Sequence, residues 1–192
     1  MSQSAISERS AGAMTGLSDI LADDLDVVFC GLNPGLRAAD VGHHFVGRGN
    51  RFWPVLFRSG VTPRLLEPAD DRLLLNEGCG LTTVVARPTA SVDQISVREF
   101  AGASAALRRK IEVHKPGFVA FLGKKAYSAI VDRSIVEWGR QTELFGGTRA
   151  WVLPNPSGRN RGFSFDELVV AYRELRLAAR AGTKRNSFVV ER

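Results

Sequence analysis

The chain of 192 residues has few of the side chains that build metal sites and disulfide frameworks. It contains two cysteines and three histidines, and their spacing matches neither a zinc site nor an iron–sulfur site. Cys30 and Cys79 lie among apolar residues, so we expect both to be small core residues. The sequence therefore predicts no metal centre.

Long apolar runs are missing as well. No stretch is long enough to cross a bilayer, and residues 1–12 lack the apolar segment of a secretory signal. We therefore expect a cytoplasmic protein with no membrane partner. A composition of 44% hydrophobic and 24% charged residues is that of an ordinary globular protein. We expect one domain at residues 16–181, between a disordered lead-in at 1–15 and a basic tail at 182–192.

Four short apolar runs rich in β-forming residues stand out along the chain. They lie at residues 26–31, 81–85, 118–122 and 149–153. Helical patterns lie between and after them, at residues 50–59, 67–77, 96–114, 124–133 and 164–181. Strands that alternate with helices favour a parallel sheet with helices on both faces. The three tryptophans, Trp53, Trp138 and Trp151, are expected in or near the core.

The first apolar run ends abruptly in the loop sequence Gly-Leu-Asn-Pro-Gly at residues 31–35. Such a loop presents the Asn33 amide and free backbone N–H groups at the carboxyl edge of the sheet, where open α/β folds bind ligands. It lacks the lysine of a phosphate loop and the spacing of a dinucleotide fingerprint. The connection continues to about Gly49, and Phe45 within it would either stack on a planar ligand or plug the loop onto the core.

A second Asn-Pro loop, residues 153–162, follows the fourth apolar run. In a parallel sheet it lies at the same edge as the first loop. Proline restricts the backbone of the residue before it, so Asn33 and Asn155 would each present a directed amide. Asn-Pro is also a common turn sequence, and a simple turn is the alternative for each residue.

Positive charge surrounds both loops. The net charge is +6 and the isoelectric point is about 9.9, which favours a polyanionic partner, with nucleic acid first. The basic residues that flank the loops are Arg37, Arg48, Arg51, Lys124, Lys125, Arg159 and Arg161.

Three motifs together resemble the mismatch-specific uracil-DNA glycosylases, relatives of thymine-DNA glycosylase in the uracil-DNA glycosylase superfamily. They are Gly-Leu-Asn-Pro-Gly at 31–35, Asn-Arg-Phe-Trp at 50–53 and Leu-Pro-Asn-Pro-Ser-Gly at 153–158. The resemblance covers roughly residues 25–178. It implies a three-layer α/β/α sandwich with a mostly parallel four-stranded central sheet. It also implies a monomer without cofactor that acts on double-stranded DNA containing uracil or a mismatched pyrimidine.

The resemblance assigns roles around the first loop. Asn33 corresponds to the residue that positions the attacking water, and Phe45 to the aromatic that stacks on the flipped base. Backbone N–H groups near Gly35 and Phe45 would stabilise the departing base, and small Ala38 and His43 lie in the pocket loop. Because an amide is a poor base, we expect slow chemistry in which stabilisation of the leaving group dominates.

The second loop would enter the DNA. By resemblance, Asn155 and Ser157 bond phosphates or the sugar–base region, and Gly158 allows a close backbone approach. Arg159 stands where the bacterial pattern has an apolar wedge, and Arg161 is expected to contact phosphate. Lys124 is a further phosphate contact. For the two loop arginines, plain solvated side chains are the alternative.

Asp93 is a departure from the family pattern. If its segment borders the cleft, Asp93 activates the water better than Asn33 does; a surface aspartate beside a helix is the alternative.

The predicted function is base excision repair by a monofunctional glycosylase that removes uracil, especially opposite guanine. The alternative is a catalytically weak module that binds mismatched or abasic DNA. A small-molecule enzyme has little support, because no nucleophile–base set appears.

Overall fold

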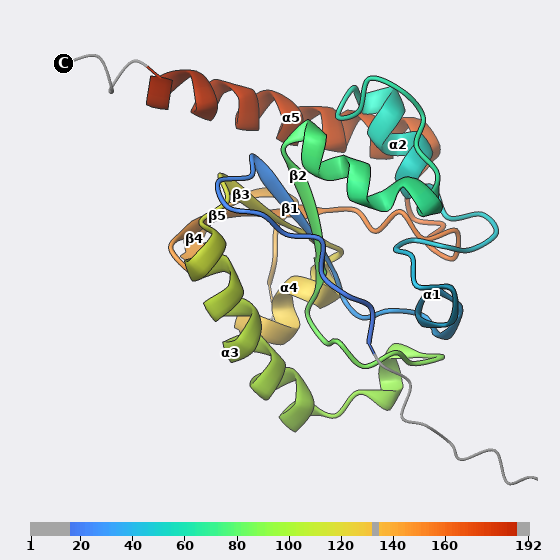
Figure 1. The fold of residues 1–192 in the computed structure, drawn as a ribbon. Helices are drawn as coiled ribbons and strands as arrows, with labels where there is room; N and C mark the ends of the chain where they lie inside the picture. The colour runs from blue at the N-terminus through green and yellow to red at the C-terminus, as the bar shows by residue number, and fades with distance from the viewer. Residues whose placement is uncertain (1–15, 132–134, 188–192) are drawn as a thin grey trace, which may run out of the picture.

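A computed structural model describes residues 16–131 and 135–187. Figure 1 shows a central sheet between two layers of helices, as predicted for an α/β sandwich. The strands are β1 (Val27–Gly31), β2 (Cys79–Thr83), β3 (Phe118–Leu122), β4 (Gly139–Phe145) and β5 (Thr148–Leu153). The helices are α1 (Leu36–Val41), α2 (Phe52–Ser59), α3 (Val97–His114), α4 (Lys124–Val131) and α5 (Phe165–Ser187), with 3₁₀ segments η1 (Pro68–Glu77) and η2 (Val92–Gln94).

The sheet has five strands in the order β2-β1-β3-β5-β4, and the expectation of four was wrong. The four apolar runs form the parallel part, and β4 pairs antiparallel with β5 at one edge. Only Phe145 of β4 is buried, so the strand has no apolar run that marks it. Gly146 and Gly147, with φ of 56° and 75°, form its hairpin turn, and this pair is the signal in the sequence.

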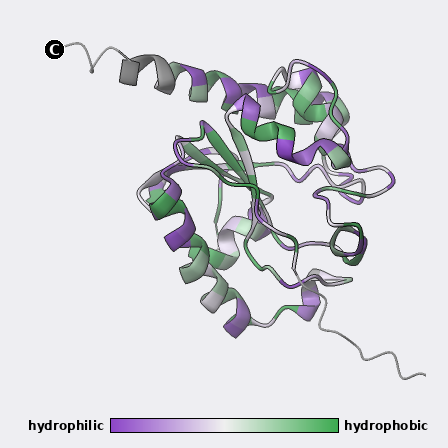
Figure 2. Ribbon diagram, in the orientation of Figure 1, coloured by the Kyte–Doolittle hydropathy of each residue, from purple (hydrophilic) through white to green (hydrophobic). Residues whose placement is uncertain are grey.

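Alternate residues of β1, β3 and β5 enter two separate cores. In β1, Val27 and Phe29 pack with the layer of α2, η1 and α5, while Val28 and Cys30 pack with α3 and α4. Figure 2 shows the strands as mostly hydrophobic and the helices as mixed, which is the pattern of a sheet buried on both faces. Cys30 and Cys79 are buried and unpaired, as expected of core residues, and burial raises the pKa of Cys79 to about 12.

Several element boundaries differ from the expected ones. Residues 68–77 form a 3₁₀ segment, and the first loop contains the short helix α1, which ends at Gly42 with φ of 76°. α3 is capped by Ser96, whose side chain accepts from the Glu99 N–H, as its capping-box spacing predicts. α5 continues to Ser187, so the first part of the expected tail is helical. The lead-in at 1–15 and residues 188–192 lie outside the described residues.

Candidate active site and DNA-facing loops

The two Asn-Pro loops leave the sheet at the same edge. β1 ends at Gly31 and β5 ends at Leu153, and both run parallel to β3, which lies between them. Asn33 and Asn155 therefore both follow the carboxyl ends of parallel strands, which confirms the predicted placement. This is the edge at which open α/β sheets bind ligands.

The Asn33 side chain is held through its amide nitrogen. Nδ2 donates to Thr89 Oγ1 at 2.7 Å, to the Pro34 carbonyl at 3.1 Å and to the Arg87 carbonyl at 3.4 Å. Thr89 is buried, and its N–H donates to the Pro34 carbonyl at 3.1 Å. Within the described residues, no hydrogen bond engages Oδ1 of Asn33. A fixed amide with a free carbonyl oxygen can accept a hydrogen bond from water and orient it.

Phe45 presents an aromatic ring beside the end of β1. Its backbone has φ of 55°, a left-handed conformation that is rare for an aromatic residue, and its ring stacks on Phe52 with centroids 3.8 Å apart. A Cβ on Gly31 would lie 4.0 Å from Phe45 Cζ, which places the ring at the carboxyl end of β1. Phe45 is half-buried, so it packs on the core and still keeps accessible surface.

A buried carboxylate holds the two histidines that precede Phe45. Asp71 in η1 is 4% exposed, and its Oδ2 accepts from the His44 N–H at 3.1 Å and lies 3.3 Å from His43 Nδ1. His44 Nε2 lies 2.9 Å from the Ser18 carbonyl and therefore carries the proton. Burial lowers the pKa of His44, because it disfavours the charged ring. No local pattern in the sequence marks Asp71, because its contacts join distant segments of the chain.

Gly35 and Ala38 lie where the first loop enters α1. Gly35 is exposed and forms a parallel bridge with Thr89. Apart from its two chain neighbours, no described residue has an atom within 4 Å of a Cβ built on Gly35, so its backbone is open to a ligand. Ala38 is buried in α1, and its part in admitting a 5-substituted base stays a prediction.

Hydrogen bonds wind the second loop into a compact turn. Asn155 Oδ1 accepts from the Ser157 N–H at 2.9 Å, and Ser157 Oγ accepts from the Arg159 N–H at 3.3 Å. Asn160 Nδ2 donates to the Asn155 carbonyl at 2.8 Å. Asn155 is thus a turn-former, as one interpretation of the sequence held. The exposed residues of the loop are Asn155, Gly158, Arg159, Arg161 and Gly162.

Arg51 joins the second loop to the first. Its Nη1 donates to the Phe163 carbonyl at 2.7 Å, and its Nη2 donates to the carbonyls of Asn160 at 2.7 Å and Ser157 at 3.2 Å. The Arg51 N–H donates to the Pro156 carbonyl at 3.0 Å. The sequence placed Arg51 only among the surrounding basic residues, and its inward direction was not foreseen.

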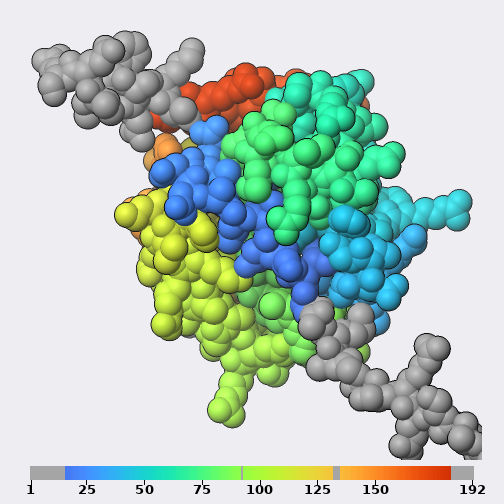
Figure 3. Space-filling model, viewed as in Figure 1, coloured from blue at the N-terminus to red at the C-terminus, as the bar shows by residue number. Residues whose placement is uncertain are grey.

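Gly158 lies against the first loop. A Cβ on Gly158 would lie 2.5 Å from the Gly49 carbonyl oxygen, so only glycine fits this contact between two backbones. Figure 1 shows the two loops side by side at one end of the molecule, and Figure 3 shows the first loop projecting there. Beside this contact, no described residue bonds to the side chains of Arg159 and Arg161. The DNA contacts assigned to these three residues stay predictions.

Lys124 and Trp138 meet near the second loop. Lys124 opens α4 as predicted, and its Nζ lies 4.8 Å from the centre of the Trp138 ring. Trp138 is 41% exposed and packs edge-on with Phe163, so the expectation of a core position was wrong for it. The cause is the unforeseen strand β4, because pairing of Gly139 with Val152 brings Trp138 to the carboxyl edge.

Asp93 lies in η2, in the segment that follows Thr89. It is exposed, and its Oδ2 accepts from Ser91 Oγ at 3.2 Å. Gln94 Oε1 accepts from the N–H groups of Ala90 and Ser91, which holds the segment together. No contact among the described residues joins Asp93 to Asn33; Asp93 lies four residues beyond Thr89, which accepts from the Asn33 amide.

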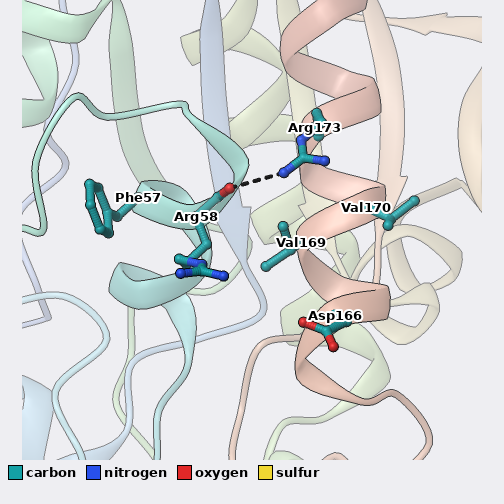
Figure 4. Close-up of a pocket in the computed structure, with 6 residues that line it drawn as sticks. All are labelled: Phe57, Arg58, Asp166, Val169, Val170 and Arg173. Carbon is teal, nitrogen blue, oxygen red and sulfur yellow. Dashed lines mark hydrogen bonds between the residues drawn. The ribbon is translucent and has the colours of Figure 1, made fainter.

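Two hollows of the molecule lie away from these loops. One of about 530 Å³ lies between α2 and α5, where Arg173 donates to the Arg58 carbonyl at 3.2 Å (Figure 4). A second of about 90 Å³ is lined by residues of β1, β2 and α5. Neither contains a residue of the two Asn-Pro loops. Within residues 16–131 and 135–187, no cluster of three or more His, Cys, Asp or Glu side chains is placed to hold a metal ion.

Among residues 16–131 and 135–187, no helix has both the length and the apolar character that a membrane span requires.

The fold and the two loops define an α/β domain with a polar, aromatic-lined site at the carboxyl edge and an arginine-bearing loop beside it. Residues 18–176 match the model of the uracil DNA glycosylase superfamily, and the chain belongs to that superfamily. Among solved structures, it resembles the solution structure of a candidate uracil DNA glycosylase from Methanosarcina acetivorans. The TM-score is 0.57 with 20% sequence identity, over 85% of this chain and 98% of that one. This likeness supports the fold.

Proposed function

We propose that the protein is a DNA glycosylase that removes uracil from double-stranded DNA, especially opposite guanine. Membership of the uracil DNA glycosylase superfamily supports the reaction class. The observation that carries the proposal is Asn33, whose amide nitrogen is fixed by Thr89 and two carbonyls while its oxygen is left for water. Phe45 lies at the same strand end and offers its ring to a flipped base.

The proposed reaction is hydrolysis in a single stage. The target nucleotide leaves the duplex and its base enters the site, because the reacting carbon is inaccessible in stacked DNA. Water held by Asn33 attacks the anomeric carbon while the bond to the pyrimidine nitrogen breaks. The base departs as an anion, the water loses its proton to solvent, and the free base takes up a proton after release. Backbone N–H groups near Gly35 would stabilise that charge. Asparagine at position 33 cannot form a Schiff base, so no strand cleavage accompanies base release.

The second loop supplies the proposed contact with DNA. Arg159 and Arg161 are exposed on a turn whose shape is fixed, and Lys124 lies nearby at the start of α4. We propose that Arg159 fills the space that the flipped base leaves and that Arg161 and Lys124 contact phosphates. The net charge of +6 favours association with DNA and a nucleoid location in the cytoplasm.

Base release from matched oligonucleotides tests the function. The substrates carry uracil opposite guanine, uracil opposite adenine, thymine opposite guanine, ethenocytosine opposite guanine, or uracil in a single strand. We expect alkali-dependent cleavage, fastest for uracil opposite guanine. Binding to abasic or mismatched duplexes without release of any base would favour the nonenzymatic binding module instead. Efficient nicking before alkali would contradict the single-stage mechanism.

Asp93 is proposed as a second contributor to water activation. It is an exposed carboxylate four residues beyond Thr89, which holds Asn33. Asp93→Asn, which keeps the shape and removes the charge, is expected to lower the rate of uracil release by about tenfold, below the usual range for a well-placed general base because no contact joins Asp93 to Asn33. Asp24→Asn removes an exposed carboxylate from the turn before β1, at the opposite edge of the sheet from both loops, and serves as control. Equal rates for wild type and Asp93→Asn would end the proposal.

A further inference from the structure

Several backbone carbonyls in and just after the second loop are turned toward the protein. The Pro154 carbonyl accepts from the buried Tyr172 hydroxyl at 3.3 Å, and the Pro156 carbonyl accepts from the Arg51 N–H. The Arg51 guanidinium donates hydrogen bonds to three more carbonyls, those of Ser157, Asn160 and Phe163. Negative carbonyl dipoles are thereby withdrawn from the outer surface of the loop, which carries Arg159 and Arg161.

The Arg51 guanidinium is an unusual anchor because it has no acidic partner. It is half-buried, and among the described residues no carboxylate lies in ion-pair distance of it and its Nε has no hydrogen-bond partner. Its charge is balanced by the three carbonyls, two of them at 2.7 Å. Only a planar fork of several donors can serve carbonyls that lie in different directions, so lysine cannot replace it.

The same residue supports the base site. Arg51 precedes α2 directly, and the first residue of α2, Phe52, is the ring on which Phe45 stacks. The close contact between Gly158 and the Gly49 carbonyl strengthens this connection between the loops. A movement of the second loop and a movement of the stacked Phe45 and Phe52 rings are therefore coupled through Arg51.

We propose that Arg51 is a positioning residue that couples opening of the duplex to capture of the base. It holds the second loop so that Arg159 fills the space that the flipped base leaves in the duplex while the base itself stacks on Phe45. The inference rests on the proposed function, and it adds a specific consequence. Arg51 matters for uracil that must be taken out of a base pair, and much less for uracil that is already unpaired.

The test compares two duplexes of identical sequence, one with uracil opposite guanine and one with uracil opposite an abasic site. Single-turnover rates on both are measured for wild type and Arg51→Lys. We expect the ratio of the paired rate to the unpaired rate to fall at least tenfold in Arg51→Lys. The ratio does not depend on how much of the variant is folded, because both rates come from one preparation.

A control and a second readout complete the experiment. Arg64→Lys, at an exposed position outside both loops, is expected to keep the wild-type ratio. A 2-aminopurine beside the uracil should show weaker unstacking with Arg51→Lys than with wild type. An unchanged ratio with normal unstacking would overturn the role of Arg51 and leave the glycosylase proposal intact. Absence of base release by wild type from both duplexes would instead overturn the proposed function itself.

Discussion

Asn33→Ala is expected to lower the single-turnover rate of uracil release by about 100-fold or more, the scale for losing one preorganised polar group at a reacting centre. The substitution removes the Oδ1 that would hold the attacking water and also the three bonds that fix the amide. Affinity for DNA should change little, because Asn33 is half-buried and its proposed role is to hold water, not to bind phosphates. Rates and affinities for one uracil duplex measure both quantities.

Two further variants locate the source of the effect. Asn76→Ala removes an exposed asparagine from η1 and should leave the rate unchanged. Thr89→Val keeps the shape of the buried side chain and removes the Oγ1 that accepts from Asn33, so we expect a smaller loss than for Asn33→Ala. A rate for Asn33→Ala within a few-fold of wild type would mean that another group holds the water.

The parallel part of the fold was predictable because its strands are buried on both faces. β1 and β3 are continuous apolar runs, and their order with the helices allowed a parallel sheet to be inferred. β4 was missed because an edge strand faces solvent and carries polar residues. Its only local signal was the Gly146-Gly147 turn, and the exposed position of Trp138 follows from the same strand.

The candidate site also has a part that the sequence predicts and a part that it does not. The position of Asn33 follows from local rules, since a strand end and a proline after it fix where the amide lies. The roles of Asp71 and Arg51 depend on contacts across 27 and more than 100 positions of sequence, and no local pattern distinguishes either from a surface charge. The sequence therefore predicts which side chains lie at the carboxyl edge of the sheet. The residues that hold those side chains in place could be identified only from the structure.

Phe45→Ala is expected to slow uracil release about 5- to 100-fold, because stacking of one base on an aromatic side chain is worth about 1–3 kcal/mol. The ring lies on Phe52 and keeps accessible surface, so its removal takes away the proposed platform for the base. Phe45→Tyr preserves the ring and should stay close to wild type. Phe45→Leu keeps apolar volume without the flat face and should fall between them.

Phe45→Ala should slow release of a base that is present in the duplex, and it should not affect binding to a duplex that lacks the base. Binding to a duplex that already carries an abasic site should be nearly unchanged in Phe45→Ala, since no base is present to stack. Phe57→Ala, which removes a 39%-exposed ring from α2 at the hollow beside α5, is the matched control and should leave base release unaltered. Equal loss of abasic-site binding and of base release would show that Phe45 acts through the shape of the loop. Its left-handed backbone would then be the feature that matters, and Phe45→Gly, which relieves that conformation, would recover more activity than Phe45→Ala.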